Sequence, residues 1–124
     1  MAAAIVVTIF PSMTTSNDGK PWTFPIVSDK AKGCGYYGQN NGMQTVSYST
    51  INSFIGVMNM QATLATDPSE DDWFDIDNTT LGNGITPVFD QTLLLNFTGN
   101  FVWIRGIIKQ FTAGEINRVL YTRN

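Results

Sequence analysis

The feature that most constrains the fold is a long β-rich stretch near the C-terminus, residues 92–121. Its central run, FVWIRGIIKQF at residues 101–111, is rich in β-branched and aromatic residues and contains no proline, as is typical of strands. Turn candidates flank this run at residues 98–100 (TGN) and 112–114 (TAG), where glycine supplies the left-handed backbone that a short connection needs. The sequence therefore predicts a C-terminal β-meander of three strands joined by two tight turns.

The central run has two different faces, because side chains alternate along a strand. One face mixes aromatic, aliphatic and cationic residues: Phe101, Trp103, Arg105, Ile107, Lys109 and Phe111. The other is mostly aliphatic: Val102, Ile104, Gly106, Ile108 and Gln110. We expect the aliphatic face to point into the core, and the mixed face to lie under a loop or against a neighbouring chain.

The rest of the chain carries further strand patterns separated by turn residues. Apart from the meander, we expect strands at residues 4–10, 22–27, 44–50, 54–66 and 73–76. A loop-rich segment, residues 12–42, contains Pro21, Pro25 and five glycines and shows no helical period. The pattern predicts one all-β domain over residues 1–124, an antiparallel β-sandwich (jelly-roll-like or immunoglobulin-like) of roughly seven to eight strands.

The strand expected at residues 54–66 also has unequal faces. One is core-like throughout: Phe54, Gly56, Met58, Met60, Ala62 and Leu64. The other becomes polar halfway along: Ile55, Val57, Asn59, Gln61 and Thr63. We expect the polar half of this second face to point to solvent or to a partner.

Composition excludes several functional classes. Only 14% of the residues are charged and the net charge is −3, so the chain has no surplus of cations for nucleic acid. The chain has no histidine, and Cys34 is its only cysteine, so we expect no intramolecular disulfide and no cofactor. The apolar run at residues 4–10 is too short to span a membrane and lacks the basic start of a signal peptide, so we expect no membrane partner.

Acidic residues gather in the stretch from residue 67 to residue 77. Because calcium binds converging oxygen ligands, the aspartates are a candidate metal site, although their spacing differs from an EF-hand loop. The metal candidates are Asp67, Asp71, Asp72 and Asp75. The alternative is a solvated acidic loop at a sheet edge, which could also pair with the cations Arg105 and Lys109.

Aromatic residues provide two further candidate sites. Trp22 and Trp73 could stack against sugar rings, whereas the same residues commonly pack in a core or an interface. The glycine-rich loop at residues 33–38 places Tyr36 and Tyr37 together, but it lacks the spacing and the lysine of a phosphate-binding loop. We expect these tyrosines to contact the sheet or a neighbouring chain. The serines have no recognisable base nearby, so the sequence predicts no enzyme.

Two stretches carry a family resemblance. The first is QATL at residues 61–64, followed by Pro68 and then by WFDI at residues 73–76. The second is GNFVWIR at residues 99–105, followed by FTAGEINRVLY at residues 111–121. Together they resemble small β-sandwich virion proteins of tailed bacteriophages, especially contractile-tailed phages of marine cyanobacteria, over roughly the C-terminal two thirds of the chain.

The resemblance implies a structural role in the virion, as a tail, baseplate, fibre or capsid-decoration subunit, with no catalytic motif to carry over. It implies other virion proteins and copies of the same chain as partners, and assembly in the host cytoplasm. We expect the interface to include Trp103, Arg105, Lys109, Tyr36 and Tyr37. The alternative function is a carbohydrate-binding β-sandwich module that attaches to a host glycan.

Overall fold

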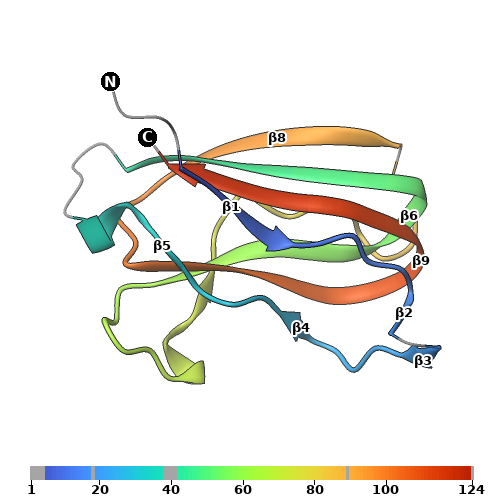
Figure 1. Ribbon diagram of the computed structural model, residues 1–124, viewed down its shortest axis with the longest axis horizontal. Helices are drawn as coiled ribbons and strands as arrows, with labels where there is room; N and C mark the ends of the chain where they lie inside the picture. The colour runs from blue at the N-terminus through green and yellow to red at the C-terminus, as the bar shows by residue number, and fades with distance from the viewer. Residues whose placement is uncertain (1–4, 18, 38–41, 89, 124) are drawn as a thin grey trace.

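Two long strands dominate the computed structural model, which describes residues 5–17, 19–37, 42–88 and 90–123 (Figure 1). They are β6 (Met43–Thr63) and β9 (Trp103–Arg123), each 21 residues long. The described residues form no α-helix. The shorter elements are β1 (Ile5–Phe10), β2 (Ser16–Asn17), β3 (Lys20–Pro21), β4 (Ile26–Val27), β5 (Ala31–Lys32), β7 (Phe74–Asp75), β8 (Gln91–Thr98) and the 3-10 helices η1 (Cys34–Tyr37) and η2 (Glu70–Asp72).

One seven-stranded antiparallel sheet contains every strand except the small β2–β3 ribbon, and it curls into a half-barrel (Figure 1). In what we call the β8 half, residues 44–51 of β6 pair with residues 115–123 of β9, and β8 and β1 lie at the edges. In the β7 half, residues 55–63 of β6 pair with residues 103–113 of β9, between β7 on one side and β4 and β5 on the other. The prediction of an all-β antiparallel fold is confirmed. The two layers expected of a β-sandwich are the β8 half and the β7 half of a single sheet.

The two halves meet at a bend that β6 and β9 make together. On β6, Asn52 and Ser53 have positive φ angles of 60° and 58°. On β9, Gly114 has φ of 81°, and a Cβ atom there would lie 2.5 Å from the Cα atom of Phe54. Position 114 therefore requires glycine for its backbone conformation and for the close approach of β6.

The predicted C-terminal meander is wrong in its pairing. β8 pairs with residues 43–50 of β6 and not with β9, while residues 112–114 lie inside β9. The turn signal at residues 112–114 marks the bend, because a glycine in the left-handed region can redirect a strand without reversing it. Reversal is absent here because β6 bends at the same level and keeps both halves of β9 paired.

The core fills the inside of the half-barrel with paired side chains from β6 and β9. In the β8 half, Val46 lies opposite Tyr121 and Tyr48 opposite Val119; all four are at most 1% exposed. In the β7 half, Ala62 lies opposite Ile104, and both are fully buried. The two tyrosine hydroxyls are satisfied, since Tyr48 donates to the Thr79 carbonyl (2.6 Å) and Tyr121 to the Gln44 side chain (2.6 Å).

A bulge changes the phase of β9. Gln110 pairs with Val57 and Ile108 pairs with Met58, so Lys109 is the extra residue. The prediction that Ile104 and Ile108 point inward is confirmed. Beyond the bulge the alternation inverts, so that Phe111 is buried and Gln110 is exposed, opposite to the predicted faces.

Two expectations for residues 54–66 are also wrong. Leu64 is 66% exposed because β6 ends at Thr63 and the chain leaves the sheet. Asn59, Gln61 and Thr63 are buried, because the chain segment from Glu70 to Asp75 lies over that outer surface.

Irregular segments cover two other stretches of sheet edge, one on β9 and one on β6. The strand predicted at residues 22–27 is confined to β4, and Met13 bridges to Ile116 of β9 through two backbone hydrogen bonds of 2.8 and 2.9 Å. Along the β7 half of β6, residues 76–88 follow the edge without forming a regular strand. Leu81 forms an isolated bridge with Met58 there.

Candidate functional site

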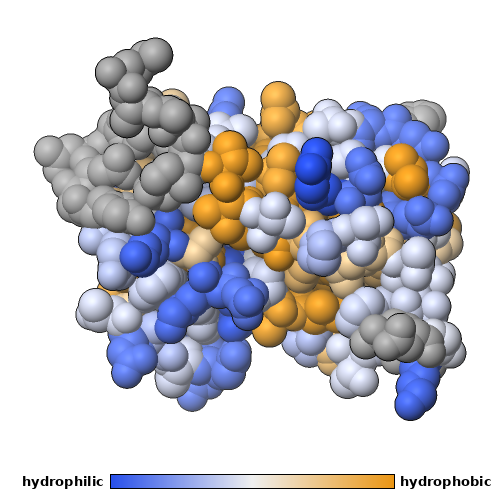
Figure 2. Space-filling model, in the orientation of Figure 1, coloured by the Kyte–Doolittle hydropathy of each residue, from blue (hydrophilic) through white to orange (hydrophobic). Residues whose placement is uncertain are grey.

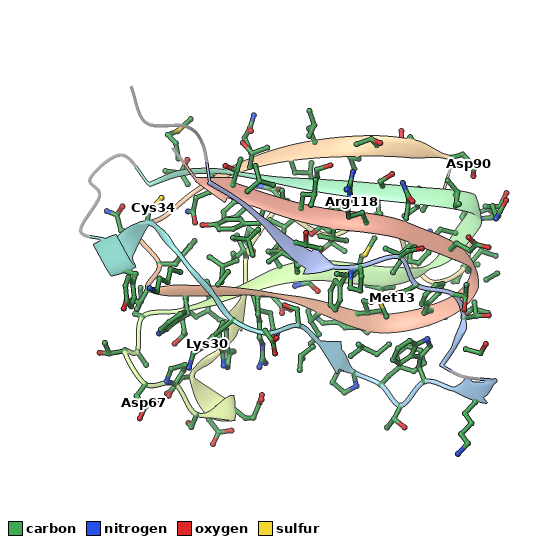
Figure 3. All side chains as sticks on the ribbon, in the orientation of Figure 1. Met13, Lys30, Cys34, Asp67, Asp90 and Arg118 are labelled. Atoms are coloured by element: carbon green, nitrogen blue, oxygen red, sulfur yellow. The ribbon has the colours of Figure 1, made fainter. Side chains whose placement is uncertain are left out.

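Most of the sequence-predicted interface residues gather on the outer surface of the β7 half. Trp103, Arg105 and Lys109 project from β9, and Tyr36 lies on η1. The side chain of Tyr37 lies outside the described part of the structure. Figure 3 shows this region beside Lys30 and Asp67.

Aromatic rings and cations alternate in this region, which we call the cation–ring cluster. It consists of Lys30, Lys32, Tyr36, Trp73, Trp103 and Arg105. The Tyr36 and Trp103 ring centroids are 5.1 Å apart, and the Lys30 and Lys32 ammonium groups each lie 4.7 Å from the Trp103 and Tyr36 centroids respectively. Contacts of this kind stabilise a surface by roughly 0.5–1 kcal/mol each when exposed. Tyr36 is 42% exposed, so its ring is the most accessible of the three aromatic rings in the cluster.

Arg105 fixes the acidic loop to the sheet. Its guanidinium Nε donates to Gln61 Oε1 (2.9 Å), and its two terminal nitrogens donate to the two Glu70 carboxylate oxygens (3.1 Å each). The same guanidinium lies 4.3 Å from the centroid of the Trp73 ring. These Arg105 hydrogen bonds, and then its charge, hold the pKa of the Glu70 carboxyl below its usual value. Arg105 itself is only 7% exposed, so a buried cation anchors Glu70 and Trp73 to the sheet.

A second ion pair closes the other end of this surface. Lys109 Nζ donates to Asp75 Oδ2 (2.6 Å), and Gln61 Nε2 donates to Asp75 Oδ1 (2.9 Å). The Lys109 hydrogen bond is the largest of the effects that lower the pKa of Asp75, followed by the Gln61 hydrogen bond. The expectation that the acidic stretch pairs with these cations is confirmed, and the pairing lies within one chain.

The predicted calcium ligands do not converge. Asp72 accepts hydrogen bonds from the Ser69 backbone (2.8 Å) and hydroxyl (3.2 Å), which caps η2. Asp75 is occupied by Lys109 and Gln61, as described above. Within the described residues, which include Asp67 and Asp71, no group of three or more acidic, cysteine or histidine side chains is placed to hold a metal.

The two candidate glycan-stacking tryptophans border different hollows. Trp22 donates from its indole nitrogen to the Thr14 carbonyl (2.8 Å) and lines a hollow of about 610 Å³ with the end of β1. Trp73 lines a groove of about 460 Å³ together with Ser28, Asp29, Lys30, Pro68 and Arg105. The two hollows meet at Ser28 and Asp29, which line both.

Sequence reasoning missed the outer surface of the β8 half, which we call the hydroxyl–aliphatic face. Register and alternation place twelve uncharged residues on it: Val6, Thr8, Met43, Thr45, Ser47, Ser49, Thr92, Leu94, Asn96, Thr98, Leu120 and Thr122. Val6 is 57% exposed and Leu94 is 64% exposed. Arg118, opposite Ser49, brings a charge only at the end near the bend.

The hydroxyl–aliphatic face forms one surface across four strands. A shallow depression of about 260 Å³ runs over Val6, Ser47, Leu94 and Leu120. Figure 2 shows hydrophobic surface above β1 and over β8, with weakly polar residues between. The side chains tie the strands together, for example through the Thr45 hydroxyl, which donates to Asn96 Oδ1 (2.7 Å). The signal in the sequence is the run of short uncharged residues Thr45, Ser47 and Ser49 on one side of β6.

Comparison with known proteins does not assign the chain to a family. No family model matches the chain, and no curated protein matches it. None of the helices in the described ranges has the length and hydrophobicity needed to cross a membrane.

Proposed function

We propose that the protein is a non-enzymatic structural subunit of a tailed-bacteriophage virion. It serves in a tail, baseplate, fibre or capsid-decoration layer and packs against copies of itself and other virion proteins. Its place of action is the virion, after assembly in the host cytoplasm. The resemblance of residues 61–76 and 99–121 to such proteins supports this proposal, and the surface of the β8 half carries it.

The observation that carries the proposal is the near absence of charge on the hydroxyl–aliphatic face. The centres of protein interfaces are depleted in charged residues, and exposed apolar residues such as Val6 and Leu94 lose contact with water when a partner covers them. A broad uncharged face is therefore suited to packing against another protein.

The face is also held rigid from below. Beneath it, Val46, Tyr48 and Val119 form the buried core of the β8 half, and Tyr48 is fixed by its hydrogen bond to Thr79. A surface on such a support loses little conformational entropy when it docks. In an assembly with many copies, even weak contacts of this face add up through multivalency.

The test is self-association of the purified chain, measured by light scattering coupled to size exclusion over a concentration series. We expect concentration-dependent oligomers that Thr8→Glu weakens, because Thr8 is an exposed member of the face. Thr80→Glu is the matched control, since Thr80 is exposed in the loop at residues 76–88, away from the face. A strict monomer at every concentration would contradict the proposal.

The second candidate function is carbohydrate binding, and the groove beside Trp73 favours it. Sugar faces stack on flat rings, and sugar hydroxyls accept and donate hydrogen bonds. Here one ring borders side chains that do both, those of Ser28, Asp29 and Lys30. A host glycan would be the partner in this case.

A glycan array tests this second candidate. The intact protein would give a signal that Trp73→Ala abolishes, with the fold checked by circular dichroism because Trp73 also stacks on Arg105. Trp22→Ala distinguishes the two hollows: a signal that Trp22→Ala removes and Trp73→Ala retains would place the sugar in the larger one. No signal from the intact protein counts against carbohydrate binding.

A further inference from the structure

The outer edge of β8 is a regular, open strand edge. β8 pairs with β6 through eight consecutive residue pairs, from Gln91 opposite Thr50 to Thr98 opposite Met43, with no shift of register. Among the described residues, no strand pairs with its other side. Backbone amides and carbonyls along that side are therefore available to another extended strand.

The edge also lacks the features that normally prevent strand addition. Natural edge strands carry lysine or proline, contain a bulge, or are very short. The β8 sequence, QTLLLNFT, has eight residues, no charge and no proline, and its register has no bulge. Its exposed Leu94 adds a hydrophobic side chain beside the open backbone.

The other sheet edges are each protected. β1, at the opposite edge of the β8 half, has a register shift between Thr8 and Phe10 and is followed by Pro11. On the β7 half, the edge strands β4, β5 and β7 have only two residues each. Two of these short strands also carry a charge, Lys32 and Asp75. β8 is thus the exception.

We infer that β8 is a homotypic assembly site, at which β8 of one subunit pairs antiparallel with β8 of a second copy across a two-fold axis. A two-fold interface brings the same surface to both partners, so the strand must be compatible with itself. An uncharged strand meets this condition because no side chain faces a like charge. This inference rests on the proposed function and names the partner as a second copy of the chain.

Symmetry limits the register of the pair. A two-fold axis perpendicular to the sheet keeps the outer faces of both subunits on the same side of the combined sheet. Such an axis must pass midway between the two copies of one residue, which face each other across the interface. The register centred on Leu94 brings the two exposed leucines together and places Thr92 of one copy opposite Asn96 of the other. The hydroxyl–aliphatic faces then form one continuous surface over eight strands.

Disulfide trapping tests the site. In a Cys34→Ala background, which removes the buried native thiol, Leu94→Cys carries one cysteine at the proposed axis. Val6→Cys is the matched control, because Val6 is similarly exposed on the same face but lies on β1. We expect mild oxidation to give a covalent dimer from Leu94→Cys at least about tenfold faster than from Val6→Cys, since facing strands hold the sulfur atoms within bonding reach.

A second pair of variants works without cross-linking. Leu94→Lys places two like charges opposite each other and should weaken self-association by at least about tenfold, whereas Thr80→Lys, exposed but away from the face, should leave it within about twofold. Retained association of Leu94→Lys, or preferential trapping through Val6, overturns the β8 site and leaves the proposed function intact. An unmodified chain that stays monomeric at every concentration overturns both.

Discussion

The outer surfaces of the β7 half and the β8 half differ, although β6 and β9 run through both. On the β7 half, Arg105 and Lys109 hold the segment from Glu70 to Asp75 against the sheet. On the β8 half, the uncharged outer residues are exposed or half-buried, with Leu94 64% exposed. The difference shows that the aromatic and cationic residues of β9 lie on a surface that the chain largely covers itself, while the serine, threonine and leucine surface of the β8 half has no such covering segment in the described structure.

The largest effect is expected at the bend that separates the halves. Gly114→Val should lower the free energy of unfolding by about 3–5 kcal/mol, because it forces a β-branched residue to a positive φ and drives Cβ against the backbone of Phe54. Urea denaturation measures the loss. Gly19→Ala is the control: Gly19 also has a positive φ of 78° but has open space around it, so only about 1 kcal/mol should be lost. Equal losses would show that the bend is not the point of strain.

The next effect concerns the covering segment of the β7 half. Arg105→Met should lower the free energy of unfolding by about 2–3 kcal/mol, because it leaves the buried Gln61 oxygen without its donor. Limited proteolysis should then cut residues 64–73 faster, since Glu70 and Trp73 lose their anchor. Lys109→Met is the control and should cost less than about 1 kcal/mol, because both members of its ion pair are exposed. A larger loss from Lys109→Met would reverse the assigned roles.

The sequence predicted the class of the fold and the places where the strands change direction, but not which strands pair. Glycine at position 114 and the polar residues Asn52 and Ser53 indicate a local backbone conformation. Whether such a point reverses the chain or bends it depends on the strand alongside, which lies some sixty residues away in sequence and leaves no local trace. The inverted phase after Lys109 has the same origin, because a bulge depends on the partner strand.

The site was predicted in part for a similar reason. Opposite charges in two separate stretches were enough to predict that the acidic segment meets Arg105 and Lys109, because few other partners exist in a chain with 14% charged residues. The calcium hypothesis failed because Asp72 and Asp75 are used by nearby donors, which spacing does not show. The open face was missed because TLLL in β8 has no alternation, so only its register with β6 shows that Leu94 points outward.

Acid should loosen the β7 half first. The pKa values of Glu70 and Asp75 are lowered in the folded chain by Arg105 and by Lys109, respectively. Stability from these pairs is therefore complete above the ordinary carboxyl pKa of about 4 and is lost as pH falls through the lower, folded values. Melting temperature followed from pH 7 to pH 2 should drop in this window. In Lys109→Met the drop should be smaller, because Asp75 loses the largest cause of its shift; an unchanged profile would exclude this linkage.

The smallest effect on stability is expected on the hydroxyl–aliphatic face. In the monomer, Thr8→Glu should change the free energy of unfolding by no more than about 0.5 kcal/mol, because the side chain is exposed. Urea denaturation at protein concentrations too low for self-association measures this change in the free energy of unfolding alone. A loss as large as that from Arg105→Met would mean that the face is part of the packed fold. A near-zero change together with lost association would mean that the uncharged surface is maintained for a partner, since the fold itself does not require it.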